Sequence, residues 1–265
     1  MEKTRVIVVG ANGRMGREVV KAVAREGDLQ LVGGVDVIED EIRIDVGGRE
    51  VQVKISSNLE ESLNALEPHV LVDFTRPGVA MNHFRLAIAK GVSPVIGTTG
   101  ITPEDIEEAG RLCAQHQVGA VIAPNFAIGA VLMMKFAEMA APYLPDVEII
   151  ELHHNAKLDA PSGTALKTAE AINRVKERWS GSPAQATNGE PAARGMSVGG
   201  IQIHSVRLPG LVAHQEVIFG GPGQVLTIRH DSLSRESFMP GVILAIRRVR
   251  GLKELVYGLD RLLGL

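Results

Sequence analysis

The stretch richest in reactive side chains is residues 151–165, which contains His153, His154 and Lys157 followed by a Ser-Gly-Thr turn at 162–164. An imidazole changes charge near neutral pH, and an ammonium group can bind anions. A helix that starts with serine and threonine adds free backbone N–H groups and hydroxyls, which bind carboxylate or phosphate. We therefore expect an active site here that moves protons on an anionic substrate.

Structural explanations of single residues in this stretch are weaker than the functional one for the whole set. One histidine, or one hydroxyl at a helix start, is more often structural than catalytic. Two adjacent histidines, a lysine four residues on and an anion-binding turn are hard to explain as packing, because lysine is rarely buried without a partner. A zinc site is disfavoured, since consecutive strand residues point to opposite faces and Cys113 is the only cysteine. We predict no metal.

A strand and a helix should position these side chains. Residues 147–152 form an apolar run that ends at His153, and residues 165–178 carry a helical pattern. Between them the chain is expected to be extended as far as Lys157, with Pro161 fixing a turn before the helix opens.

A second motif lies near the N-terminus. An apolar strand pattern at residues 4–9 leads into the spacing Gly-x-x-Gly-x-x-Gly at residues 10–16 and then into a helical pattern. Such glycines let a backbone approach the pyrophosphate of a dinucleotide at the helix N-terminus. The next strand pattern, 29–35, ends at Asp36, where a contact to a ribose hydroxyl belongs. We expect dinucleotide binding; the alternative is a plain capping turn.

The residue after Asp36 bears on the choice of cofactor. It is Val37, and not arginine or lysine. A carboxylate accepts a hydrogen bond from a ribose 2′-hydroxyl but repels a 2′-phosphate, so NADH is expected in preference to NADPH. Arg14 in the glycine turn weakens that preference, and NADPH stays an alternative.

The first 126 residues alternate between strand and helix patterns. Residues 40–53 are polar with one short alternating piece. The expected later helices are 58–66, 79–90 and 103–116, and the expected strands are 70–75, 94–97 and 119–123. This alternation indicates an α/β fold of Rossmann type, with a doubly wound parallel sheet. The polar tips after two of its strands, 75–78 and 97–100, belong on the ligand side.

The pattern changes from Ala127 onwards. A methionine-rich helix is expected at 129–141, and a long polar segment at 181–195 is interpreted as a loop or inter-subunit arm. Three alternating runs separated by glycine and proline turns follow, at 200–208, 212–219 and 224–230. They predict an α+β domain for substrate binding and oligomerisation, with a mainly antiparallel open sheet whose free face pairs with sister subunits.

Two further helices are expected at 238–249 and 252–263, and they should return to the first domain. The dinucleotide-binding domain is therefore predicted to be discontinuous, comprising 1–126 and 237–265, and the substrate domain to comprise 127–236.

Composition excludes several classes of partner. The chain has 265 residues, 45% of them hydrophobic, with a net charge of −3 and only 3% aromatic residues, which does not favour nucleic acid. The longest apolar stretch, 120–134, is interrupted and too short to span a membrane. A lone cysteine and an N-terminus without a signal peptide lead us to expect a cytoplasmic protein.

Five motifs carry a resemblance over essentially the whole chain. They lie at 9–16, 73–75, 97–100, 123–126 and, most specifically, 153–164, where two histidines, a lysine and Asp-Ala-Pro-Ser-Gly-Thr follow one another. In these residues the chain resembles the 4-hydroxy-tetrahydrodipicolinate reductase (dihydrodipicolinate reductase) family.

The resemblance implies reduction of a cyclic dicarboxylate, 4-hydroxy-tetrahydrodipicolinate, by NAD(P)H with loss of water, in the diaminopimelate route of lysine biosynthesis. It implies that His153 is the proton donor and acceptor and Lys157 the second proton donor. The groups that hold the substrate carboxylates would be His154, Gly163 and Thr164. The groups implied for the cofactor are Gly10, Ala11, Asn12, Gly13, Arg14, Met15, Asp36, Gly97, Thr98, Thr99, Ala123, Pro124, Asn125 and Phe126.

The resemblance also implies a homotetramer. Two other readings of the residues stay open at this point. A nicotinamide-sensing regulator would keep the glycine turn but would not need His153 and Lys157. Another two-domain NAD-dependent dehydrogenase would differ in its substrate.

Overall fold

The computed structural model describes residues 2–179 and 191–265. The described chain divides into two compact units. Unit 1 comprises Met1–Phe126 and Phe238–Leu265, and unit 2 comprises Ala127–Ser237. Unit 1 is therefore built from two separate stretches of chain.

Unit 1 contains an eight-stranded sheet. Its strands are β1 (Thr4–Val9), β2 (Leu29–Val35), β3 (Asp40–Val46), β4 (Arg49–Ser56), β5 (Val70–Asp73), β6 (Ser93–Ile96), β7 (Ala120–Ile122) and β13 (Leu255–Tyr257). Their order is β13-β7-β6-β5-β1-β2-β4-β3, and every neighbouring pair is parallel except β3 with β4. The predicted doubly wound parallel sheet is confirmed.

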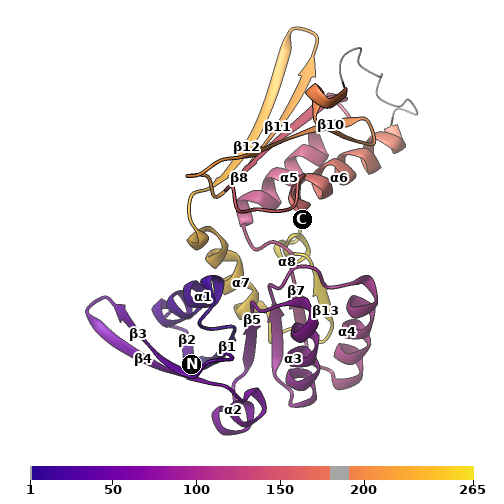
Figure 1. Cartoon of the computed structure of the whole chain (residues 1–265). Coiled ribbons are helices and arrows are strands. Elements are labelled where there is room, and N and C mark those ends of the chain that lie inside the picture. The colour runs from indigo at the N-terminus through magenta and orange to yellow at the C-terminus, as the bar shows by residue number, and fades with distance from the viewer. Residues whose placement is uncertain (1, 180–190) are drawn as a thin grey trace. The chain divides into compact units, whose positions relative to one another are not determined.

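Helices cover both faces of this sheet (Figure 1). They are α1 (Arg14–Arg25), α2 (Leu59–Leu66), α3 (Pro77–Ala89), α4 (Pro103–His116), α7 (Met239–Val249) and the short α8 (Leu259–Leu263). Helices α1 and α7 pack on one face, and α2, α3 and α4 lie on the other. The central strand β5 is consequently buried along its whole length. This burial explains why Val70, Leu71 and Val72 are all apolar, with the buried carboxylate of Asp73 at the end of the strand.

The strand order reverses between β1 and β5. From β1 the chain moves to β2 on one side, and from β5 it moves to β6 on the other. In an open α/β sheet the crevice at the carboxyl ends of two such strands is the usual place for a ligand. The glycine turn follows β1 directly, so the fold places it at that edge.

Two elements of unit 1 differ from the sequence-based expectation. The stretch 40–53 is part of a hairpin, β3 and β4, whose alternating polar and apolar residues suit an edge with one exposed face. The helix expected at 252–263 is wrong: β13 pairs with β7 as an edge strand, and only α8 is helical. Gly258, with φ of +95°, separates the two elements.

Unit 2 is built on a five-stranded sheet. Its strands are β8 (Asp146–His153), β9 (Met196–Val198), β10 (Ile201–Arg207), β11 (Ala213–Gly221) and β12 (Gln224–Ser232). The order is β12-β11-β8-β10-β9, with only β8 and β10 parallel. The predicted mainly antiparallel sheet is confirmed, but β8 separates β10 from β11, so the three consecutive strands are not all neighbours.

Helices α5 (Ile128–Ala140) and α6 (Gly163–Trp179) pack on one face of this sheet (Figure 1). The buried core between them includes Met133, Ile149, Ile172, Val217 and Phe219. Alternate residues of β8 and β11 point into this core, which leaves the other set on the opposite face.

The polar segment predicted at 181–195 falls partly outside the described residues. Within its described end, residues Pro191–Arg194 form a 3-10 helix, η1, and a second one, η2, spans Arg235–Phe238. None of the helices in the described part of the chain combines the length and apolar character that crossing a bilayer requires.

Candidate active site

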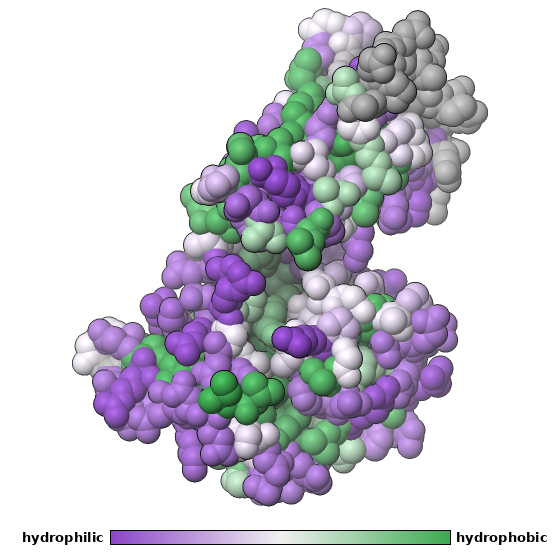
Figure 2. Space-filling model, in the orientation of Figure 1, coloured by the Kyte–Doolittle hydropathy of each residue, from purple (hydrophilic) through white to green (hydrophobic). Residues whose placement is uncertain are grey.

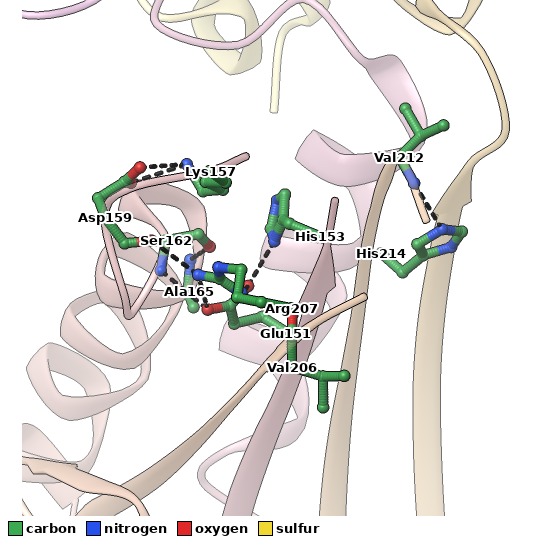
Figure 3. A network of polar contacts seen from close by, with 10 residues as sticks. All are labelled: Glu151, His153, Lys157, Asp159, Ser162, Ala165, Val206, Arg207, Val212 and His214. Atoms are coloured by element: carbon green, nitrogen blue, oxygen red, sulfur yellow. Dashed lines mark hydrogen bonds and ion pairs between the residues drawn. The ribbon is translucent and has the colours of Figure 1, made fainter. Parts of the chain in front are cut away.

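The C-terminal end of β8, the central strand of unit 2, carries a buried carboxylate next to a histidine. Strand β8 ends at His153, as predicted, and Glu151 lies two residues earlier on the same face of the strand. The side chain of Glu151 has no exposed surface. Its Oε2 atom forms a hydrogen bond with Nδ1 of His153 (Figure 3). The histidine ring is therefore anchored through one nitrogen.

Arg207 pairs with the same carboxylate from the neighbouring strand β10. Its Nη1 lies 2.9 Å from Oε2 of Glu151, and its Nη2 lies 2.7 Å from Oε1, so the contact is bidentate. The parallel register of β8 and β10 sets Arg207 opposite His153 and thereby brings the guanidinium to the carboxylate. This forked geometry makes a strong and well-oriented ion pair.

The surroundings of Glu151 keep it ionised. Burial on its own would raise its pKa, but hydrogen bonds from His153, Arg207 and Ser205 outweigh burial and lower the pKa to about 2. The backbone N–H of Ser162 also donates to Oε1, over 3.2 Å. At neutral pH the group is a carboxylate that only accepts hydrogen bonds.

Lys157 lies beyond a tight turn. The N–H of Lys157 donates to the carbonyl of His154 over 3.1 Å, so the expected extended path is wrong. The turn formed by this hydrogen bond is shorter than an extended segment of the same four residues. It therefore keeps Lys157 close to the end of β8. The Nζ atom of Lys157 lies 2.6 and 2.8 Å from the two carboxylate oxygens of Asp159, and this contact lowers the pKa of Asp159.

The helix start predicted at 162–164 is present. Helix α6 begins at Gly163, and Oγ of Ser162 accepts a hydrogen bond from the N–H of Ala165 over 3.2 Å, as an N-cap does. Gly163 is exposed, and the Ala160–Pro161 peptide bond before the cap is cis. The exposed helix start leaves backbone N–H groups that can face an anion.

These groups form one cluster in unit 2. His153, Lys157, Asp159, Ser162 and Arg207 all lie around Glu151 in Figure 3. Nη2 of Arg207 also donates to the carbonyl of Asp159 over 2.7 Å, which ties the lysine turn to the carboxylate network. The structure therefore brings the predicted catalytic pair and the anion-binding turn together.

In unit 1, the glycine turn has the shape that a dinucleotide needs. Gly10 has φ of +77°, and a Cβ atom at Gly16 would lie 1.9 Å from the carbonyl oxygen of Gly10. Only glycine fits this close approach of helix and turn. Helix α1 begins after Gly13 with no side-chain cap among its described neighbours, so its first N–H groups are open to an anion.

Asp36 is tied to the same turn. Its Oδ2 accepts a hydrogen bond from the N–H of Asn12 over 2.8 Å, and its Oδ1 accepts one from Val37 over 2.7 Å. In the described part of the chain, Oδ1 of Asn12 is buried without a hydrogen-bond partner. A carboxylate and a free amide oxygen beside the turn suit the hydroxyls of a ribose.

A second buried carboxylate organises the ends of β5 and β6. Asp73 has no exposed side-chain surface, and its Oδ1 accepts hydrogen bonds from the N–H and hydroxyl of Thr75, at 2.8 and 2.7 Å, and from Thr98, at 3.0 Å. Its Oδ2 lies 2.7 Å from Nδ1 of His83. The segment Gly97, Thr98 and Thr99 is held in place by this network.

The segment Ala123 to Phe126 follows β7 and lies beside these groups. The N–H of Ala123 donates to the carbonyl of Ile96 over 3.0 Å, and the ring of Phe126 packs 5.8 Å from that of Phe74. All predicted cofactor residues of unit 1 thus follow the carboxyl ends of parallel strands. Their chemistry and spacing fit a nicotinamide dinucleotide.

Four buried or half-buried groups around these clusters were not predicted as site residues: Glu151, Arg207, Asp73 and His83. A signal existed for Glu151, because residues i and i+2 of a strand share a face and a charged residue in an apolar strand is unusual. Arg207 comes from a distant part of the sequence, and only the pairing of β8 and β10 brings it to Glu151. His83 is closer to its carboxylate in sequence, because it lies on α3, the helix that follows β5 and Asp73.

Comparison with protein-family models gives two matches that together span the chain. Residues 4–126 match the model described as dihydrodipicolinate reductase, N-terminus, and residues 129–263 match dihydrodipicolinate reductase, C-terminus.

Curated proteins named 4-hydroxy-tetrahydrodipicolinate reductase are similar over the full length. The protein from Moorella thermoacetica is 53% identical over 264 residues, covering 98% of this chain and 97% of that protein. The protein from Geobacillus thermodenitrificans is 53% identical over 262 residues, covering 98% of each.

Solved structures agree with these matches. A dipicolinate-bound dihydrodipicolinate reductase from Paenisporosarcina sp. TG-14 superposes with a TM-score of 0.83 at 44% identity, covering 98% of this chain and 99% of that one. An amine dehydrogenase from Mycobacterium smegmatis, at 14% identity and a TM-score of 0.62, covering 97% of this chain and 95% of that one, shares the fold alone.

Proposed function

Because the chain belongs to the dihydrodipicolinate reductase family, we propose how its own residues carry out the reaction of that family. The chain is an NAD(P)H-dependent oxidoreductase that reduces 4-hydroxy-tetrahydrodipicolinate to tetrahydrodipicolinate with loss of water, in the diaminopimelate route of lysine biosynthesis. The observation that carries the assignment of residues is the cluster around Glu151, which joins an imidazole, an ammonium group and a helix start. A nicotinamide-sensing regulator would not need this cluster, and the anion-binding helix start favours a substrate rich in carboxylate over that of another dehydrogenase.

Unit 2 is proposed to hold the dicarboxylate. The exposed start of α6 offers the N–H groups of Gly163 and Thr164 and the hydroxyl of Thr164 to one carboxylate. His154 and Lys157, at the turn after β8, are assigned to the remaining anionic groups. Asp159 must release Nζ of Lys157 as the substrate arrives, because both its oxygens contact that atom.

The chemistry assigned to His153 and Lys157 is proton transfer. Reduced nicotinamide, when bound, supplies the hydride. Reduction of the conjugated ring leaves an enamine that must gain a proton on carbon, and a positioned acid accelerates such a step by about 10²–10⁴-fold. His153 is proposed as that acid, and Lys157 as the second proton donor. An imidazole can alternate between donor and acceptor near neutral pH, which fits repeated turnover.

Unit 1 is proposed as the dinucleotide-binding domain, with NADH as the preferred cofactor. The turn from Gly10 to Met15 would face the pyrophosphate and Asp36 the adenosine ribose, while the segments 97–99 and 123–126 would flank the nicotinamide. Support for NADH comes from the carboxylate of Asp36 beside the turn and from the neutral, exposed Val37, since neither attracts a 2′-phosphate.

The protein is further proposed to be a cytoplasmic homotetramer whose subunits contact one another through unit 2. Figure 2 shows apolar surface along the β11–β12 arm, where Val225 and Leu226 are exposed. An open sheet with such a surface gains from pairing with a second copy. Sedimentation analysis tests the assembly: a monomer at micromolar concentration would contradict it.

The proposed cytoplasmic location is consistent with the lone cysteine, Cys113, which is buried and forms no disulfide.

Cofactor oxidation tests the function directly. With enzymatically generated 4-hydroxy-tetrahydrodipicolinate, we expect rapid loss of NADH absorbance that depends on the substrate, and slower loss with NADPH. The control is the same protein without substrate. Binding of NADH without substrate-dependent oxidation would contradict the assignment, and faster oxidation of NADPH would contradict the role given to Asp36 and Val37.

A further inference from the structure

Glu151 is an unusual residue for its position. In the described part of the chain, Glu151 and Asp73 are the only acidic residues that are fully buried. Taking an ion pair such as Glu151 and Arg207 out of water is expensive, and a well-packed apolar pair of similar size is often at least as stable. Stability alone therefore does not explain this pair under His153.

The hydrogen bonding of Glu151 dictates where His153 carries its proton. An ionised carboxylate can only accept, so the hydrogen between Oε2 and Nδ1 belongs to Nδ1 of the ring. The other ring nitrogen, Nε2, is then the one that gains and loses a proton. A histidine acting as acid needs this arrangement, because a ring free to rotate or to change tautomer offers the wrong nitrogen part of the time.

We propose that Glu151 and Arg207 are positioning residues of the reaction: Glu151 fixes the tautomer and orientation of His153, and Arg207 holds Glu151 in place by its two-point contact. The proposal deepens the proposed function and rests on the role assigned there to His153. Because Ser162 also donates its N–H to Glu151, the same carboxylate aligns the start of the anion-binding turn with the imidazole.

The proposed proton transfer leaves Glu151 ionised throughout. The Nε2–H bond of the imidazolium breaks as the new C–H bond forms on the enamine carbon, and the iminium product keeps the charge. The ring becomes neutral and retains its hydrogen on Nδ1. Glu151 is a carboxylate before and after the step, so it lowers the free energy of the imidazolium without exchanging a proton.

Several charged groups surround the imidazole of His153, and each can affect how kcat depends on pH. Glu151 lies on the same strand, Arg207 on β10, and the Lys157–Asp159 pair on the following turn. On β11, Ala213 is the direct partner of His153 in the register, and its neighbour His214 is held by Asp231 at 2.6 Å. His154 is the next residue in the chain. Among these groups, only Glu151 contacts Nδ1 of His153 in the described structure.

The substitution Glu151→Gln tests the proposal, because glutamine keeps the shape and an oxygen for the N–H of Ser162 but loses the charge. We expect kcat to fall by at least about tenfold but no further than in His153→Ala, for which general-acid catalysis predicts a loss on the order of 10²–10⁴. The Michaelis constant for the substrate should change little. The falling, alkaline limb of the kcat profile should move to lower pH, since the imidazolium loses its counter-charge beside Arg207.

The chain offers a matched control on the other face of the same strand. Glu148 pairs with Arg194 and with His204, whose Nε2 lies 2.8 Å away, so Glu148→Gln removes the same kind of contact away from His153. We expect Glu148→Gln to leave kcat and its pH profile unchanged. Nitrogen NMR of histidine-labelled protein adds a readout independent of turnover: the Nδ1 proton signal of His153 should shift in Glu151→Gln alone.

A second variant covers the case in which Glu151→Gln does not fold, because it leaves Arg207 without its partner. Glu151→Gln combined with Arg207→Gln leaves no uncompensated charge, and we expect it to fold and to show the same loss of kcat. Unchanged kcat, pH profile and Nδ1 signal in a folded variant, while His153→Ala is impaired, would overturn the positioning role and leave the proposed function standing. Full turnover by His153→Ala would overturn both.

Discussion

Lys157, proposed as the second proton donor, has a defined partner in the structure. Its side chain is 21% exposed, and its ammonium group contacts both carboxylate oxygens of Asp159. In the proposed mechanism, an oxygen of the dicarboxylate would have to compete with Asp159 for this ammonium group.

Replacing Lys157 by alanine should reduce kcat by about 10²–10⁴-fold, because the residue proposed as the second proton donor is lost. The dissociation constant of NADH should stay nearly unchanged, since the proposed cofactor groups belong to unit 1. Steady-state kinetics and titration of NADH fluorescence measure the two quantities. Lys157→Arg, which keeps the charge, should lose less activity; weakened NADH binding together with lost turnover would show that the site is wrongly assigned.

Glu151 also makes stability depend on pH. Its pKa is lowered from 4.5 to about 2 in the folded chain, which contributes on the order of 3 kcal/mol. A lowered pKa means that this stabilisation is fully present above about pH 4.5 and is lost as pH falls towards 2. Denaturant unfolding should show a free energy of unfolding that falls over this range. In Glu151→Gln that part of the pH dependence should be absent, and an identical slope in both proteins would contradict the assigned cause.

At the scale of elements, α4 shows how local sequence sets a boundary. Thr102 accepts a hydrogen bond from the N–H of Asp105 over 3.2 Å, and Asp105 accepts one from the N–H of Thr102 over 3.3 Å. This reciprocal pair is a capping box, and Pro103 occupies the first helical position.

Thr102→Ala should therefore lower the free energy of unfolding by about 1 kcal/mol, because the N-cap oxygen is lost. Thr102→Ser keeps that oxygen and should cost only a few tenths of this amount. Thermal unfolding of the three proteins measures the difference. Equal losses in the serine and alanine variants would mean that the methyl group, and not the cap, stabilises the helix.

The elements that the sequence predicted well are those with strong local signals. The helix expected at 103–116 has those bounds, because proline, a capping threonine and an apolar periodicity agree there. The helix expected at 252–263 failed because a short apolar run can be read as either element, and the pairing of β13 with β7 is decided by residues far away in the sequence. The insertion of β8 between β10 and β11 is likewise a long-range outcome.

The same division holds for the candidate site. His153, Lys157 and the helix start at Gly163 are close in the sequence, and their spacing was enough to predict that they lie together. Arg207 reaches Glu151 across 56 positions of the chain, through the pairing of two parallel strands. No local pattern contains that information. Sequence reasoning therefore found the groups proposed to react and missed those that support them.

At the scale of the whole molecule, each unit has a sheet, covering helices and a buried core of its own. The proposed cofactor groups all lie in unit 1 and the proposed substrate groups all lie in unit 2. Each ligand should therefore stabilise its own unit.

Hydrogen exchange followed by mass spectrometry tests this separation. NADH at about 100 times its dissociation constant stabilises the folded state that binds it by about 2.7 kcal/mol. With NADH alone, we expect protection of residues 10–16, 97–99 and 123–126 and little change at 151–165; dipicolinate should protect 151–165. Protection of 151–165 by NADH and not by dipicolinate would contradict the division of roles.

The discontinuity of unit 1 has a consequence for synthesis on the ribosome. Strand β13 adds the last edge of the sheet begun by β1 and helix α7 covers one of its faces, yet both are translated after the whole of unit 2. A nascent chain that has emerged as far as residue 237 can already close the core of unit 2, while β7 still exposes an unpaired edge. Unit 1 therefore begins first and is completed last, and until then both its open edge and the sheet face that α7 covers are exposed to aggregation or to a chaperone.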